Sequence, residues 1–471
     1  MFLRWARRTG DDGSSSQSTL ALPISDTLFR EYETTFLSAE FAYPGSPLTL
    51  SSISGSNAAS VSVYVTWLGV RSDEKSLYRP VAIAFNADLS VRWVNMLDEL
   101  AWLRLPCWSG MPDPVADASG SVVFASFPTS CVYPSYVAAA LVSLSMSDGS
   151  LRWTTNVSVP SSQPPVVQTS QPILVASDVL VAIGLNTPYP TNGSISFFDT
   201  MTGELALDAP LQIPPSVSAP ELAVSPAGDV LVYSGSTPGS FVGVNVSRWA
   251  RALASNSSAA PDGFGSVLWR NLWTNGLRIE KSTAAFVPGT RDLLLLCNLS
   301  SLVAVNGTTG VVLWSSAYPA GFDKANDRLF TLTRQGIAFV WAYVWVTSSP
   351  AEYQIAVSAY NISAARPGVP APLVTNATLF ERLGPIRRVW AADDGSSTMA
   401  QVDEPNPNPS LILRAELAGD AISFCGGGGA SACAALPPML DVFPGPAPAS
   451  YAGVGRDGVL SLWKDAASVT K

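Results

Sequence analysis

Residues 302–314 read Leu-Val-Ala-Val-Asn-Gly-Thr-Thr-Gly-Val-Val-Leu-Trp, an apolar run, a turn, and a second apolar run that ends on tryptophan. The aliphatic and β-branched residues on each side of the turn are typical of strands. Gly310 permits the positive φ of a tight hairpin, and the alternation after it places aliphatic side chains and the indole ring in position to pack. The segment therefore predicts two antiparallel strands joined by a hairpin.

The same ending recurs along the chain, with glycine four residues before tryptophan. It occurs at residues 149–153 and 265–269. Residues 203–207 keep the spacing with leucine in place of tryptophan, and residues 87–93 keep the tryptophan without the glycine. Self-similarity of this kind indicates a repeat architecture.

Two types of strand alternate through the chain. The first type follows a turn, at residues 61–65, 121–124, 179–182, 230–233, 293–296, 337–340, 397–400 and 451–454. The second type begins at Val81, Leu141, Ile195, Val242, Leu302, Ile355, Leu411 and Val459. The seven intervals between the second-type starts average 54 residues. Repeats of that size suit a blade of four strands.

A strand and hairpin unit cannot bury both faces of its small sheet alone, so neighbouring units must stack on it. Blades arranged around an axis meet this need and leave few exposed edges. We therefore predict an all-β fold, a single β-propeller of about eight four-stranded blades. Seven blades is the alternative, because the units near Ile355 and Leu411 lack the glycine-to-tryptophan ending.

The prediction for the organisation of the chain has two parts. Residues 1–19 are expected to be a disordered or processed tail, and residues 20–471 to form the propeller. Because the chain ends soon after Trp463, we expect a strand from within Leu20 to Phe41 to complete the last blade and close the ring.

The combination of a glycine turn, an apolar strand, a Leu-x-Ala-Leu-like strand and a Thr-Gly-x-x-x-Trp ending resembles the pyrroloquinoline-quinone (PQQ) repeat family. The resemblance covers about residues 55–471. WD40 and Kelch propellers are the alternatives, but their Trp-Asp endings or paired glycines do not recur. The resemblance implies either a quinoprotein dehydrogenase, with PQQ and Ca²⁺ on the propeller axis, or an interaction scaffold of the non-catalytic type.

Histidine is absent from the 471 residues. Its absence excludes Ser-His-Asp and Cys-His catalysis and imidazole-bound zinc or haem. Members of the resembled family that oxidise alcohols hold two adjacent cysteines against the cofactor, and those that oxidise sugars use a histidine base. The five cysteines here include no adjacent pair. We therefore predict a non-enzymatic protein without PQQ or Ca²⁺, and assign no catalytic, cofactor-binding or metal-binding residue.

Charged residues make up 13% of the chain against roughly 25% in ordinary soluble domains, and mean hydropathy is +0.24. Attached sugar is one source of solubility for such a chain. N-glycosylation sequons occur at Asn156, Asn192, Asn245, Asn256, Asn298, Asn306, Asn361 and Asn376. Chance would give roughly three, so they predict a glycoprotein of the extracellular space or the secretory-pathway lumen. The alternative is turn chemistry, at residues 192–194 and 306–308 above all.

The cysteines and the N-terminal segment are compatible with an extracellular or luminal location. The candidate disulfides, which the sequence alone does not decide, are Cys107 with Cys131 and Cys425 with Cys433. Cys297 is interpreted as a small core hydrophobe. No segment approaches the length of a membrane-spanning helix, and residues 1–13 lack the apolar core of a signal peptide. If the sequons are used, we expect the true N-terminus upstream of Met1, with a disordered tail as the alternative.

Binding is the function class that remains. Net charge is −9, and no basic block beyond Arg4, Arg7 and Arg8 would attract nucleic acid. We predict a scaffold that uses its propeller faces for protein–protein interaction, as a subunit of a larger extracellular or luminal assembly. The alternative is a carbohydrate-binding propeller, whose sugar-stacking candidates near loops or outside the repeat position are Trp102, Trp108, Trp341 and Trp345.

Overall fold

A computed structural model gives the fold. It describes residues 16–19, 36–44, 48–50, 61–72, 76–86, 91–95, 115–116, 120–126, 139–157, 168–169, 173–175, 180–188, 191–206, 211–213, 222–234, 240–246, 264–272, 284–287, 289–290, 292–297, 300–320, 322, 325–333, 335–348, 351–379, 386–391, 397–403, 410–418, 421–425, 439–444, 450–455 and 460–464. The regular secondary structure in these ranges is β-strand, joined by turns, with one 3-10 helix, η3 (Ile362–Ala364). None of the described segments is a helix long and apolar enough to cross a membrane.

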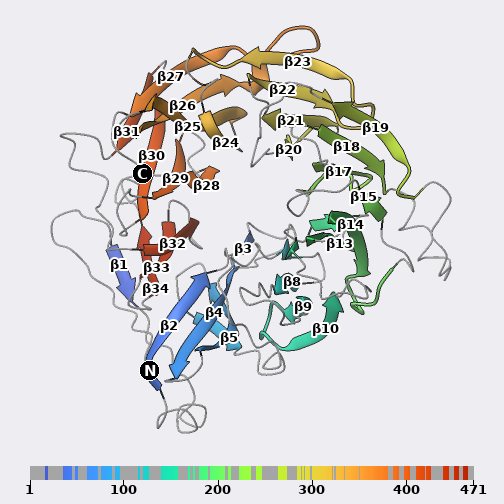
Figure 1. The fold of residues 1–471 in the computed structure, drawn as a ribbon, viewed down its shortest axis with the longest axis vertical. Helices are drawn as coiled ribbons and strands as arrows, with labels where there is room; N and C mark the ends of the chain where they lie inside the picture. The colour runs from blue at the N-terminus through green and yellow to red at the C-terminus, as the bar shows by residue number, and fades with distance from the viewer. Residues whose placement is uncertain are drawn as a thin grey trace. The chain divides into compact units, whose positions relative to one another are not determined.

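The chain divides into two compact units, and the first comprises Met1–Pro220 and Met439–Lys471. Its described strands form four antiparallel sheets (Figure 1). The first sheet contains β2 (Phe36–Pro44), β3 (Leu48–Leu50), β4 (Val61–Ser72), β5 (Ser76–Asn86) and β6 (Val91–Asn95). The second contains β7 (Val115–Ala116), β8 (Ser121–Ser126), β9 (Ala139–Ser145) and β10 (Leu151–Val157). The third contains β11 (Gln168–Thr169), β12 (Ile173–Val175), β13 (Leu180–Pro188), β14 (Thr191–Asp199) and β15 (Leu211–Ile213). The fourth contains β32 (Met439–Pro444), β33 (Ser450–Gly455), β34 (Leu460–Lys464) and β1 (Ser16–Thr19).

The second unit, Glu221–Pro438, also has four antiparallel sheets among its described residues. They are β16 (Leu222–Val224), β17 (Val230–Ser234), β18 (Ser240–Asn245) and β19 (Val267–Leu272); then β20 (Ala284–Phe286), β21 (Leu293–Cys297), β22 (Ser301–Asn306) and β23 (Val312–Ala317). The last two are β24 (Ala325–Leu332), β25 (Ile337–Ser348), β26 (Ala351–Asn361) and β27 (Leu373–Leu379); then β28 (Ile386–Ala391), β29 (Ser397–Asp403), β30 (Ser410–Ala418) and β31 (Ala421–Cys425).

The strand types expected from the sequence are the second and third strands of these sheets. Every first-type range overlaps one of β4, β8, β13, β17, β21, β25, β29 and β33. Every second-type start lies in or within one residue of β5, β9, β14, β18, β22, β26, β30 and β34. The prediction of an all-β propeller fold built from four-stranded antiparallel sheets is confirmed, while the number of blades in a closed ring stays a prediction.

The strand that completes the last sheet differs from the one we expected. β1 pairs with β34, with Ser16 opposite Lys464 and Thr19 opposite Ser461 (Figure 1). It lies inside the segment expected to be a tail, and before the expected range Leu20 to Phe41. β2, which overlaps the end of that range, pairs with β4 in the first sheet instead.

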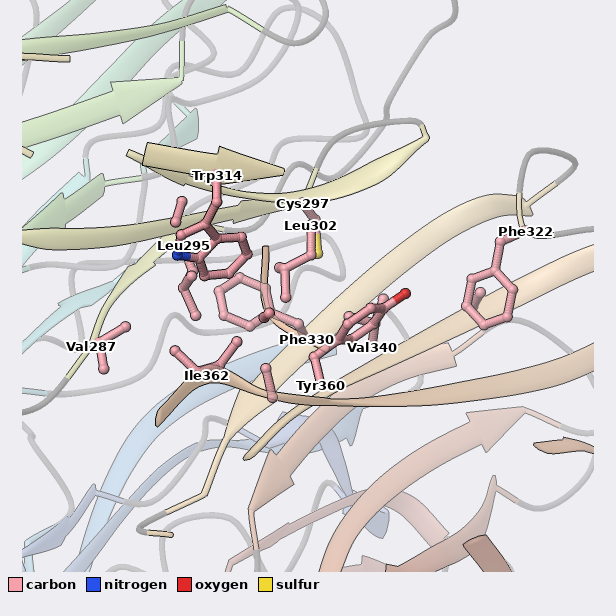
Figure 2. Close-up of a cluster of buried hydrophobic side chains, with 14 of the residues drawn as sticks. Val287, Leu295, Cys297, Leu302, Trp314, Phe322, Phe330, Val340, Tyr360 and Ile362 are labelled. Atoms are coloured by element: carbon pink, nitrogen blue, oxygen red, sulfur yellow. The ribbon is translucent and has the colours of Figure 1, made fainter. Parts of the chain in front are cut away.

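Buried side chains alternate between the two faces of each central strand. In β21, Leu295 and Cys297 pack toward the sheet of β24–β27, while Leu294 and Leu296 pack toward the sheet of β16–β19. Figure 2 shows the first of these clusters, which also contains Trp314, Val340 and Tyr360. A strand that is buried on both faces needs apolar residues at every position, which explains the uninterrupted run of leucines.

Candidate functional site

Successive sheets are joined through the hairpin between the third and fourth strands. The indole N–H of Trp269 on β19 donates to the Gly307 carbonyl of the next hairpin at 2.6 Å, and Asn271 Nδ2 donates to the Gly310 carbonyl at 2.9 Å. Gly310 has φ +70°, and a Cβ there would lie 2.5 Å from Cγ of Trp269. The hairpin glycine thus allows both the turn and the close approach of the indole ring.

The first unit repeats this arrangement. Trp93 Nε1 donates to the Met146 carbonyl and Trp153 Nε1 to the Thr200 carbonyl, each at 2.9 Å. A Cβ at Gly149 would meet the Trp93 ring at 2.4 Å, just as one at Gly203 would meet Trp153. The expectation that the repeated tryptophan packs is therefore confirmed, and its partner is a turn in the following repeat.

Asparagine and aspartate cap these hairpins in the same way. Asn306 Oδ1 accepts hydrogen bonds from the backbone N–H groups of Thr308 and Thr309 at 3.1 and 2.8 Å. Asp199 Oδ1, at the matching position of its hairpin, accepts from Met201 and Thr202 at 2.8 and 2.9 Å. An aspartate, which cannot carry an N-linked sugar, thus makes the hydrogen bonds that Asn306 makes.

The predicted sequons lie in different environments. Asn361 is half-buried, and its Oδ1 accepts from the Ala364 backbone N–H to begin η3. Asn245 is half-buried at the end of β18, whereas Asn376 is exposed on β27. Asn156 lies in β10 and Asn192 in β14, but their side chains are outside the description. Asn256 and Asn298 lie outside the described residues. The interpretation of residues 192–194 as a turn is wrong, because they pair with β13 inside β14.

The structure describes only some of the predicted sugar-stacking tryptophans and disulfide cysteines. Trp341 is fully buried in the core between two sheets, and its Nε1 donates to Thr398 Oγ1 at 3.2 Å, so its assignment to sugar stacking is wrong. Trp345 lies in β25, but its side chain is outside the description. Trp102 and Trp108 lie outside the described residues. Cys425 ends β31, and Cys107, Cys131 and Cys433 lie outside the described residues. Cys297 is buried in the core, as expected.

Polar side chains are buried beside Cys297. The Arg328 side chain is almost fully buried, donates from Nη2 to the Phe322 carbonyl, and places its guanidinium carbon 5.7 Å from the centre of the Tyr318 ring. Burial raises the pKa of the Tyr318 hydroxyl well above its ordinary value, and the Cys297 thiol adds to the shift. Burial likewise raises the pKa of Tyr360, whose hydroxyl donates to the Ala317 carbonyl at 3.1 Å. The two tyrosine hydroxyls therefore stay protonated near neutral pH, beside the buried Arg328 side chain.

The tryptophans at the repeat position are used between sheets. Each of Trp93, Trp153 and Trp269 is at most 9% exposed and donates its indole N–H to a hairpin of the next sheet. None of these rings is available as a platform beneath a quinone. Within the described ranges, no three His, Cys, Asp or Glu side chains lie close enough together to hold a metal ion.

An aliphatic strip, by contrast, is exposed on three sheets of the second unit. Its members lie in or beside the first residues of the outer strands β19, β23 and β27, and are 39–58% exposed: Val267, Leu268, Val311, Val312, Val369 and Leu373. Direct contacts join its parts, since Asn271 donates to Gly310 and the Gly368 N–H donates to the Leu313 carbonyl at 2.9 Å. Exposed apolar side chains gathered on neighbouring outer strands are typical of interaction surfaces. The sequence pattern missed the strip, because it assigned these residues to packing inside the blades.

Two solved propeller structures are similar to this chain. One is the C-terminal WD40 domain of Sif2, at 10% identity and a TM-score of 0.48, covering 91% of this chain and 97% of that one. The other is the WD40 domain of SCAP from fission yeast, at 9% identity and a TM-score of 0.46, covering 85% and 92%. At these TM-scores neither similarity adds to the fold assignment, which rests on the strand pairing. No curated protein sequence matches the chain.

A family model gives the stronger comparison. The model described as outer membrane protein assembly factor BamB, which represents PQQ-like repeats, matches residues 91–333, just over half of the chain. The matched segment contains the docked tryptophans Trp93, Trp153 and Trp269 with their hairpins. On this match, and on the repeated sheet that the residues build, the chain belongs to the PQQ-like repeat family of outer membrane protein assembly factor BamB.

Proposed function

We propose that this protein is a non-enzymatic scaffold that binds another protein through the aliphatic strip of its second unit. The observation that carries the proposal is the exposure of Val267, Val311 and Val369, each more than half accessible, on outer strands or hairpins of three sheets. Aliphatic side chains in this number are costly to leave in water unless a partner covers them. The family description, which names an assembly factor, agrees with such a role.

The proposal includes the absence of a catalytic cofactor. The sequence has no histidine and no adjacent cysteine pair, and the described tryptophans are used between sheets. We therefore expect the purified protein to show no absorbance from a quinone cofactor and no change in stability on calcium removal. Quinone absorbance in the native protein would favour a dehydrogenase instead.

The proposal also places the protein in the extracellular space or the secretory-pathway lumen, as a subunit of a glycoprotein assembly. Its support is the number of sequons and the low charge of the chain. Glycopeptide mass mapping of the protein from its native source tests this address. Occupied sequons support it, whereas eight unmodified sequons would contradict it and would place the scaffold inside the cell.

Cross-linking tests the strip itself. In the native source, the wild-type chain is expected to be cross-linked to a partner, and the double substitution Val311→Glu with Val312→Glu is expected to abolish that product. Val94→Glu is the matched control, because Val94 is an exposed valine on β6, outside the strip. Cross-linking that yields only monomers, or the same product from all three proteins, would contradict the proposal. Equal melting temperatures of the three proteins exclude an effect through folding.

A further inference from the structure

The outer strand β27 lacks the edge protection seen on β6, β10, β19 and β23. Among the described strands it hydrogen-bonds only to β26, and its sequence, Leu-Val-Thr-Asn-Ala-Thr-Leu, contains no charge, proline or glycine. Leu373 at its start is 42% exposed. Segments of this composition on a sheet edge are templates for pairing with another chain.

Four other outer strands, unlike the uncharged β15 and β31, block their edges by means that can be identified. An exposed arginine lies on each of three of them, Arg92 on β6, Arg152 on β10 and Arg270 on β19. β23 has no charge, but the loop before β27 lies against it, since the Gly368 N–H donates to the Leu313 carbonyl. Charge and a covering loop are both recognised ways of preventing edge-to-edge association. β27 has neither.

Asn376 lies in the middle of this strand, in the sequon Asn376-Ala377-Thr378. Asn376 and Thr378 are both exposed and, being two residues apart in a strand, point to the same side. Asn376 lies opposite Ser358 on β26, on the face whose neighbours Ala356 and Tyr360 pack toward the sheet of β20–β23. A sugar on Asn376 would therefore extend from that face of the outer strand, next to its outer edge.

We propose that Asn376 carries an N-linked glycan that protects the β27 edge, as arginine protects β6, β10 and β19. The proposal rests on the secretory address proposed above. The reaction transfers an oligosaccharide from a lipid-pyrophosphate-linked donor to Asn376 Nδ2. A bond from sugar C1 to the amide nitrogen forms, the bond from C1 to the donor's phosphate oxygen breaks, the nitrogen loses a proton, and the lipid pyrophosphate leaves.

The test compares secreted full-length chains produced behind a cleavable signal sequence in a glycosylating cell. Asn376→Gln and Thr378→Ala both remove the sequon, and Asn376→Arg removes it while adding the charge found on β6, β10 and β19. Asn306→Asp is the matched control, because it removes a sequon but keeps the turn acceptor that Asp199 shows to be sufficient. Site occupancy comes from glycopeptide mapping, and oligomeric state from size-exclusion chromatography with light scattering.

We expect Asn376 to be occupied and the wild type, Asn306→Asp and Asn376→Arg to be monomeric, with loss of the monomer peak for Asn376→Gln and Thr378→Ala. A vacant Asn376 beside other occupied sequons would overturn this inference and leave the secretory address intact. No occupancy at any sequon would overturn both. An occupied Asn376 whose removal leaves the protein monomeric, or association of Asn376→Arg, would overturn the protective role alone.

Discussion

The hairpin glycines serve two purposes that a substitution can separate. Gly310 and Gly289 both have positive φ, of 70° and 76°, but only Gly310 faces a neighbouring ring, that of Trp269. Gly289→Ala is expected to cost about 1–2 kcal/mol in unfolding free energy, from backbone strain alone. Gly310→Ala is expected to cost more, because the added Cβ also displaces the indole. Equal losses in urea unfolding would contradict this role of Gly310.

Burial of tyrosine hydroxyls predicts a loss of stability in alkali. The pKa of Tyr318 is raised in the folded chain above its ordinary value of 10.0, so the unfolded chain releases this proton first as pH rises. The stabilisation is complete below pH 10 and is lost as pH increases beyond it. Unfolding free energies measured from pH 8 to 11 should fall less for Tyr318→Phe than for the wild type. Parallel pH profiles would show that Tyr318 does not contribute.

At the scale of the element, the fourth strand and the following hairpin form one docking unit. Trp269→Phe removes the donor to the Gly307 carbonyl and is expected to cost about 1–3 kcal/mol, because that buried acceptor is left unsatisfied. Asn271→Ala removes the neighbouring bond to the Gly310 carbonyl. Since both bonds hold one hairpin, we expect the double mutant to lose less than the sum of the single losses.

The control for this cycle is Ser315→Ala. Ser315 is exposed on β23, away from the two docking bonds, and its substitution is expected to change stability by less than about 0.5 kcal/mol. Strict additivity of Trp269→Phe and Asn271→Ala would mean that the two bonds act independently.

Most elements could be predicted from the sequence because the apolar pattern repeats. Turn glycines flanked by aliphatic runs locate the second and third strands of each sheet, and the fourth strand follows from the tryptophan. The acceptor of each indole N–H could not be predicted, because Trp153 and Thr200 are 47 residues apart and belong to different sheets. The strand of Trp341, Ile337–Ser348, is buried on both faces. In the sequence, such a strand and an aromatic cluster near a loop both appear as a continuous apolar run, so Trp341 was misassigned.

The candidate surface was less predictable than the fold. Val311 and Val312 follow the hairpin glycine in the repeat, so the pattern assigned them to packing inside the sheet stack. Their exposure depends on which residues of neighbouring sheets cover them, and the pattern of one repeat does not give this. The sequon at Asn376 was visible in the sequence, but its position on an outer strand required the strand pairing.

At the scale of the whole molecule, the two ends of the chain are paired in one sheet. The residues of β1, Ser-Gln-Ser-Thr, are entirely polar, which is why the apolar pattern placed the closing strand further along. A chain lacking residues 1–19 should melt below one lacking only residues 1–13, which keeps β1. Each kcal/mol of lost pairing corresponds to about 1 °C in the melting temperature of a chain of this length. Identical melting temperatures would show that β1 adds no stability.

The direction of this pairing also sets how the molecule responds to force. Ser16, at the start of β1, lies opposite Lys464, at the end of β34. Tension applied through these two residues acts at one end of the strand pair, so the hydrogen bonds break one after another and do not share the load. The sheet that holds both ends should therefore peel open under a weak pull, even where the same bonds resist heat.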